Sequence, residues 1–141
     1  MKIRRSGRWV LVDTSALVGI FMRDDDWHGP AVEALEKLQA SGRMMLTTND
    51  VFGETLTALR RWAGHAQAVG VGDILRQSEL VKLVSIDDTT REAAWKLFKK
   101  YDDQVLSFTD CTSFATMHRF QIQEAFTFDD DFRKVGYTVL P

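Results

Sequence analysis

This chain of 141 residues contains a single cysteine, Cys111, and only three histidines. One cysteine excludes an internal disulfide and a cysteine-based zinc cluster. The histidines, His28, His65 and His118, stand far apart and match no metal-binding spacing, so zinc is not expected. A metal centre in this chain would have to use oxygen ligands.

Long apolar runs are also missing. None approaches the roughly 18 residues of a transmembrane helix. The basic start, Met1–Arg5, superficially resembles a signal peptide, but Asp13 interrupts the apolar stretch behind it and no small-residue cleavage site follows cleanly. We therefore expect a cytoplasmic protein without a membrane partner.

An excess of positive charge is absent as well, because 18 lysines and arginines face 20 acidic residues, for a net charge of −2. This balance argues against a dedicated basic nucleic-acid-binding module, whose affinity comes mainly from phosphate neutralisation. It does not exclude a nuclease, since the acids can be concentrated in one metal-filled pocket. With 45% hydrophobic residues and no repeat or linker, residues 1–141 are expected to form one domain.

Segments with strand character alternate with segments of helical periodicity. The predicted strands are 9–13, 44–47, 81–86, 124–128 and 135–140. The predicted helices are 16–21, 31–40, 49–61, 65–77, 90–100 and 107–120, with a charged loop at 22–29 and a polar turn and loop after residue 128. This alternation predicts a parallel sheet covered by helices on both faces.

Four acidic residues lie at the edges of these predicted elements. Asp13 and Asp129 each follow an apolar strand-like run, whereas Glu54 and Asp110 fall in the early turns of two predicted helices. Carboxylates at the carboxyl ends of parallel strands point into the crevice where such folds place their sites. If the four converge, their repulsion requires a cation, and hard oxygen ligands select Mg²⁺ or Mn²⁺. The pattern indicates metal-assisted phosphodiester hydrolysis.

Two of these acids have an ordinary explanation as helix caps. Asp13 can be an N-cap, although Thr14 and Ser15 can also cap and the position does not require a carboxylate. Ser107 and Asp110 fit a capping box, in which the acid reaches back to the helix start. Asp110 gains its functional interpretation from the other acids.

The other two acids can be explained as surface residues. Glu54 has apolar helical neighbours and could be an ordinary surface glutamate, but its segment opens with a polar Asn-Asp entry. Asp129–Asp131 could be a polar turn, but three consecutive acids repel one another and a cation would help to explain them. We choose Asp129 as the inward acid, with Asp131 as a helper.

Several other residues have simple interpretations. Cys111 and Met117 are expected to pack inside the protein. Arg60–Arg61 and Arg133–Lys134 are either solvated charges or phosphate contacts at the mouth of the site.

The ordered set of motifs resembles the PIN-domain family, and within it the VapC-type toxins of bacterial toxin–antitoxin pairs. The matching pieces are Val10–Leu17, Asn49–Leu56, Ser107–Asp110, Ala125–Asp129 and Asp131–Tyr137. Asp-Thr-Ser is a weak motif by itself, but the ordered set is fairly specific and spans residues 9–140.

The resemblance implies a three-layer α/β/α fold around a five-stranded parallel sheet. It implies a Mg²⁺- or Mn²⁺-dependent endoribonuclease. By position, Asp13, Glu54, Asp110 and Asp129 correspond to the family's catalytic and metal-binding acids, and Thr14 to the hydroxyl beside the first acid. Asp13 and Asp110 would hold the ion, with the other two completing the site directly or through water.

The resemblance also implies partners. We expect an RNA substrate, a homodimer and a small antitoxin whose tail lies over the site. Trp27, Trp62 and Trp95 are candidate contact residues for these protein partners. Burial or subunit contact is preferred to base stacking for Trp62 and Trp95. The sequence does not identify the RNA, whose bases would be recognised by loops such as 22–29.

Three alternatives stay open. Some PIN proteins process RNA without being toxins. A Mg²⁺-binding phosphoacceptor domain would need adjacent acids after the first strand and a late strand-end lysine, whereas Asp13 has no acidic neighbour and Lys134 is expected in a loop. A module that only binds a partner would show no cleavage.

Overall fold

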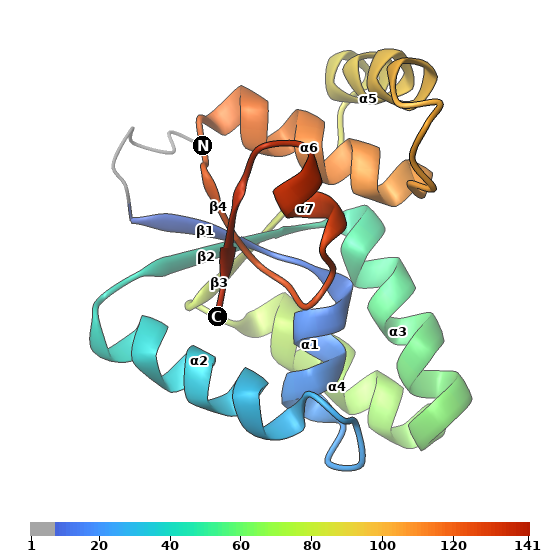
Figure 1. Cartoon of the computed structure of the whole chain (residues 1–141). Coiled ribbons are helices and arrows are strands. Elements are labelled where there is room, and N and C mark those ends of the chain that lie inside the picture. The colour runs from blue at the N-terminus through green and yellow to red at the C-terminus, as the bar shows by residue number, and fades with distance from the viewer. Residues whose placement is uncertain (1–7) are drawn as a thin grey trace.

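The computed structural model describes residues 8–141, so Met1–Arg5 lie outside the described part of the chain. The strands are β1 (Trp9–Val12), β2 (Met44–Thr48), β3 (Val81–Val84), β4 (Glu124–Phe126) and β5 (Thr138–Leu140). The helices are α1 (Thr14–Phe21), α2 (His28–Ala40), α3 (Asn49–Ala63), α4 (His65–Gln77), α5 (Asp88–Lys100), α6 (Phe108–Phe120) and α7 (Asp131–Lys134). Strands and helices alternate much as the sequence predicts (Figure 1).

All five strands form one parallel sheet in the order β3-β2-β1-β4-β5. From β1 the chain moves outward through β2 to β3, and later returns to the other side of β1 for β4 and β5. The direction of winding therefore reverses between β1 and β4, which is where open α/β sheets hold their sites. The predicted three-layer fold with a five-stranded parallel sheet is confirmed.

Both faces of the central strand are buried. Val10 and Val12 belong to the core that packs against α1, α2, α3 and α4, whereas Leu11 belongs to the core under α5, α6 and α7. Figure 1 shows the same arrangement, with α5 and α6 on one side of the sheet and α1, α2 and α4 on the other. Burial on both faces explains why β1 is a nearly continuous apolar run and not an alternating one.

Polar side chains fix the starts of the helices that follow strands. The hydroxyl of Thr48 accepts a hydrogen bond from the Val51 amide at 3.1 Å, as expected for the N-cap of α3. Gly64 separates α3 from α4. Its φ of +98° is rarely adopted by residues with a side chain, which explains why glycine occupies this position. Helix α4 has the predicted bounds.

The prediction of a polar turn and loop after residue 128 is wrong for Asp131–Lys134, which form the short helix α7. The Asp131 amide donates to Oδ1 of Asp129 at 2.9 Å, and this local bond starts the turn. Phe132 is fully buried and fixes the helix against the core. One deeply buried ring within a charged segment outweighs its polar composition.

Some element boundaries also differ from the predictions. β3 ends at Val84, β4 at Phe126, and β5 begins only at Thr138, so these strands are shorter than their apolar runs. Helix α2 begins at His28, and Pro30 is accommodated in its first turn because the first amides of a helix have no acceptor within it.

Cys111 and Met117 are fully buried in α6, as the sequence predicts. Within residues 8–141 no helix has the length and apolar character needed to cross a membrane.

We expect Leu46→Ala to lower the free energy of unfolding by about 2–5 kcal/mol, because the side chain is fully buried and its loss leaves a cavity. The matched control is Leu80→Ala, whose side chain is 49% exposed, and it should change stability by about 0.5 kcal/mol or less. Urea unfolding of the two variants measures the difference, and equal losses would contradict the assignment of the core.

Candidate active site

The four acids singled out in the sequence line one pocket of about 580 Å³ at the carboxyl ends of β1 and β4. They come from four separate parts of the chain, namely the end of β1, the second turn of α3, the first turn of α6, and the turn after β4. The acidic residues that line the pocket are Asp13, Asp25, Glu54, Asp110, Asp129 and Asp131.

Asp13 is the most deeply buried of these acids, at 5% exposed. Its amide donates to the Phe126 carbonyl at 3.0 Å, which ties the end of β1 to the end of β4. Burial raises the pKa of Asp13 to about 7, and the nearby charges of Asp110 and Asp129 add to the rise. Asp13 is the N-cap residue of α1 but makes no side-chain capping bond, so capping does not explain its carboxylate.

Asp110, Asp129 and Asp131 form the tightest acidic group. One carboxylate oxygen of each lies within 4.8 Å of the other two, a spacing that one oxygen-liganded ion can bridge with small side-chain rotations. Burial raises the pKa of Asp110 and that of Asp129, and Asp131 raises both further. Asp131 therefore lies beside Asp129 in this group.

Asp110 has two roles at once. Its carboxylate accepts a hydrogen bond from the Ser107 amide, and its own amide donates to the Ser107 hydroxyl, both at 3.0 Å. The capping box expected from the sequence is therefore present, and it holds the same carboxylate in the pocket.

Glu54 lies on α3 at the rim of the pocket. The residue is exposed, but its Oε2 accepts a hydrogen bond from the Thr14 hydroxyl at 3.2 Å, so the carboxylate is turned toward the end of β1. Desolvation raises the pKa of Glu54, and the charges of Asp110 and Asp50 raise it further. Thr14, predicted to act beside the first acid, positions Glu54 in this structure.

Two hydroxyl residues that the sequence did not mark as site residues connect the acids. Thr127, fully buried, donates to Oδ2 of Asp13 at 2.9 Å and accepts from the Asp129 amide at 3.0 Å. The Ser15 hydroxyl lies 3.1 Å from that of Thr127 and accepts from the Phe128 amide. Since Thr127 gives its only hydroxyl proton to Asp13, Ser15 donates to Thr127. The sequence feature that could have indicated Thr127 is its position between the apolar strand β4 and Asp129.

A family model described as the PIN domain matches residues 10–137. The chain belongs to the PIN-domain family. It is 37% identical over 129 residues to the 23S rRNA-specific endonuclease VapC20 of Mycobacterium tuberculosis, a match that covers 91% of this chain and 95% of that protein. The predicted family resemblance is confirmed.

Solved structures of PIN-type proteins share the fold. The crystal structure of M. tuberculosis VapC20, described as a Sarcin-Ricin loop cleaving toxin, superposes with a TM-score of 0.84 at 36% identity and covers 94% of this chain and 99% of that one. VapBC2 from Rickettsia felis, bound to a DNA fragment from its promoter, has a TM-score of 0.71 at 12% identity and covers 94% and 97% of the two chains. The Rickettsia structure supports the fold alone.

PIN domains bind divalent metal at an acidic cluster, and the donor set of this pocket fits such an ion. All the charged side chains among the described lining residues are carboxylates, whose hard oxygen atoms suit Mg²⁺ and Mn²⁺. No lysine or arginine occurs among the described residues that line the pocket. Burial is the main reason why the pKa of each of the four predicted acids is raised, and repulsion from neighbouring acids adds to it. A cation would relieve that repulsion.

The basic residues considered as phosphate contacts lie in different places. Lys134 is nearest the acids, with its Nζ 3.5 Å from Oδ1 of Asp131, and it lowers the pKa of Asp129. Arg133 pairs with Asp130 outside the pocket. Arg60 lines a separate groove of about 470 Å³ between α3 and α4.

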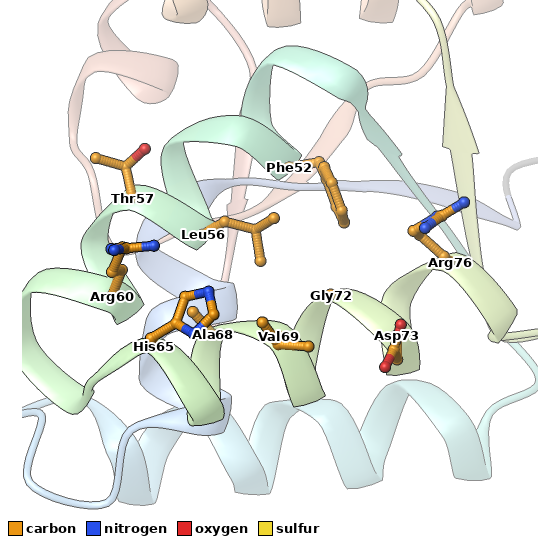
Figure 2. A pocket seen from close by; sticks show the side chains of 10 residues that line it. All are labelled: Phe52, Leu56, Thr57, Arg60, His65, Ala68, Val69, Gly72, Asp73 and Arg76. Carbon is orange, nitrogen blue, oxygen red and sulfur yellow. The ribbon is translucent and has the colours of Figure 1, made fainter.

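That α3–α4 groove has the wrong composition for a metal site. Phe52 and Leu56 of α3 point toward α4, Arg60 and His65 lie near one end, and Asp73 and Arg76 lie near the other (Figure 2). Asp73 is the single carboxylate among its lining residues.

In EDTA, we expect the stability of the native protein to fall as the pH rises from about 4 to about 7. The ordinary pKa of an aspartate is 3.8, and folding raises that of Asp13 to about 7. Between these values the folded state keeps a proton that the unfolded state has released, so a higher pH favours unfolding. The loss is at most about 4 kcal/mol, because a tenfold change in proton affinity corresponds to about 1.4 kcal/mol.

Asp13→Asn should flatten this dependence and raise the melting temperature in EDTA near pH 7. Asp87→Asn is the control with the opposite sign, because Asp87 caps α5 by accepting from the Thr90 amide, which lowers its pKa. Its loss should destabilise the protein at neutral pH. Thermal unfolding across pH measures both effects. A lower melting temperature for Asp13→Asn would contradict the electrostatic strain.

Proposed function

We propose that this chain is a Mg²⁺- or Mn²⁺-dependent endoribonuclease that hydrolyses RNA phosphodiester bonds, and that it is the toxin of a toxin–antitoxin pair. The observation that carries the proposal is the arrival of four carboxylates, from four separate elements, in one pocket at the switch point of the sheet. The 37% identity to a PIN-domain rRNA endonuclease over most of both chains supports the same chemistry.

We propose that Asp110, Asp129 and Asp131 hold the ion together with Asp13, and that Glu54 acts at the rim of the site. A divalent ion bound there would supply an activated water and would offset the charge that develops on the scissile phosphate. Several carboxylates in one pocket suit a Mg²⁺ centre, since a single carboxylate binds this ion weakly.

The surrounding hydroxyls keep these carboxylates in place. Thr127 links Asp13 to Asp129 through its side chain, at 2.9 Å and 3.0 Å. Ser107 restrains Asp110 through the capping box. Such outer contacts orient metal ligands, so they reduce the reorganisation needed when an ion and a substrate enter.

VapC20 supports a particular class of substrate. It is named a 23S rRNA-specific endonuclease and is 37% identical to this chain over 129 residues. We therefore propose a structured loop of 23S rRNA as the substrate class, and the cytoplasm as its location. Unpaired nucleotides in loops expose their bases and their backbone to a shallow pocket, which a paired helix does not.

We expect Asp110→Asn to abolish cleavage of total RNA, because an amide ligand lacks the charge that binds the ion. The native protein should cleave with Mg²⁺ or Mn²⁺ and stop in EDTA. Asp73→Asn is a matched control from the α3–α4 groove and should keep full activity. End mapping of the fragments then identifies the RNA site.

Cleavage in EDTA, or by Asp110→Asn, would remove the metal-assisted mechanism. Metal binding without any cleavage would instead favour the phosphoacceptor or binding-only alternatives.

For the partners, we propose a homodimer inhibited by a small antitoxin, and Trp62 and Trp95, 69% and 46% exposed, as residues for protein contact. Expression of the native chain should arrest growth, and co-expression of a short neighbouring reading frame should restore it. Asp110→Asn should be harmless, because the effect requires cleavage. A native chain that cleaves RNA without slowing growth, and without such a neighbour, would be an RNA-processing nuclease.

A further inference from the structure

Trp27 lines the acidic pocket and is the only aromatic residue among its described lining residues. Its side chain is 50% exposed, and it lines the same pocket as Asp110 and Asp129. One ring face is covered, because it stacks on Phe128 with centroids 4.8 Å apart and an angle of 8° between the planes. A flat ring that is half exposed and covered on one face has its other face free for contact with a ligand.

The ring stack is anchored in the core. Phe128 meets Phe126 edge to face, with centroids 6.2 Å apart, and Phe126 is fully buried in the sheet. Phe128 also directly precedes Asp129. The series from Phe126 to Trp27 therefore fixes an aromatic surface beside the carboxylates.

The backbone around Trp27 is fixed as well. Its amide donates to Oδ2 of Asp25 at 3.1 Å, and its carbonyl accepts from the Ala31 amide at 2.8 Å. The next residue, His28, places Nδ1 2.7 Å from the Gly19 carbonyl oxygen of α1. A β-carbon on Gly19 would lie 3.0 Å from that of Ala31, so glycine permits this close approach of α1 and α2. The ring is thus preorganised, which lowers the entropy cost of binding to it.

The charge of the pocket explains why a substrate needs such a surface. Its described lining contains six acids and no lysine or arginine, so it offers no direct cationic contact to a phosphate. A bound divalent ion would attract only the phosphate beside it. Stacking of a base on an aromatic ring supplies affinity without opposite charge and tolerates any base.

We propose that Trp27 is a substrate-positioning residue, on whose free face an unpaired RNA base next to the scissile phosphate stacks. This inference rests on the proposed ribonuclease function. It distinguishes Trp27 from Trp62, which lines a different hollow together with Arg23 and Gln67.

The test compares Trp27→Ala, Trp27→Phe and the control Ile74→Ala on a short RNA that contains the mapped cleavage site. Ile74 is an exposed apolar residue of α4 that does not line the acidic pocket. Trp27→Ala should lower kcat/KM about 5- to 100-fold, mainly through a higher KM, as expected for one lost base stack. Trp27→Phe should retain most of the activity because it keeps a ring, and Ile74→Ala should match the native protein.

A substrate that lacks one base separates stacking from a structural effect. Removing the base beside the scissile phosphate should weaken the native enzyme as much as Trp27→Ala does, and should cost Trp27→Ala little more. If the loss in Trp27→Ala stays the same with every abasic substrate, or equals that of Ile74→Ala, the inference is overturned. It is also overturned if Trp27→Ala converts a dimer into a monomer on size exclusion while RNA affinity is unchanged.

RNA binding by the inactive Asp110→Asn protein distinguishes this inference from the proposed function. The two proteins compared are Asp110→Asn and the double variant Asp110→Asn/Trp27→Ala, each titrated in EDTA with a fluorescein-labelled single-stranded RNA. The double variant should have a Kd about 5- to 100-fold higher. That result in a chain whose native form does not cleave would support the base-stacking surface and reject the nuclease. Cleavage by the native form with equal Kd values for the two proteins would reject only the stacking surface.

Discussion

The repulsion among the carboxylates at the ends of β1 and β4 is the constraint on which the rest of this site depends. Asp13 is buried at the carboxyl end of β1, and both its burial and its acidic neighbours oppose its ionisation. In the proposed function, a bound cation would account for a carboxylate at this position, because it would convert the repulsion into metal affinity.

The pairing and burial of β1 in the sheet offset the cost of placing a carboxylate at its end. β1 is buried on both faces and pairs with β2 and β4, so the position of Asp13 is determined by backbone hydrogen bonds and two apolar cores. The carboxylates attach to the ends of these rigid elements, and the hydroxyl of Thr127 connects two of them. Rigid support of this kind holds charged ligands in place before an ion or a substrate arrives.

Structural and functional explanations coincide at several of these residues. Asp110 completes a capping box and lines the pocket with the same carboxylate. Asp129 starts the turn of α7 through the Asp131 amide and also belongs to the tight acidic group. Asp13 differs, since its side chain caps nothing. A residue's local role therefore does not decide whether it also takes part in chemistry.

The sequence by itself determined the order of strands and helices, because apolar periodicity and caps such as Thr48 act over a few residues. It also determined which acids stand at element ends, and so which four were candidates. Only the tertiary structure decided that the four acids line one pocket, that Asp131 lies in the same tight group as Asp110 and Asp129, and that Thr127 and Ser15 connect the acids. The bonds of Thr127 to Asp13 and Ser15 join residues more than a hundred positions apart, so no local pattern predicts them. The helix α7 was missed for the same reason, since its formation depends on burying Phe132 in a core made by distant segments.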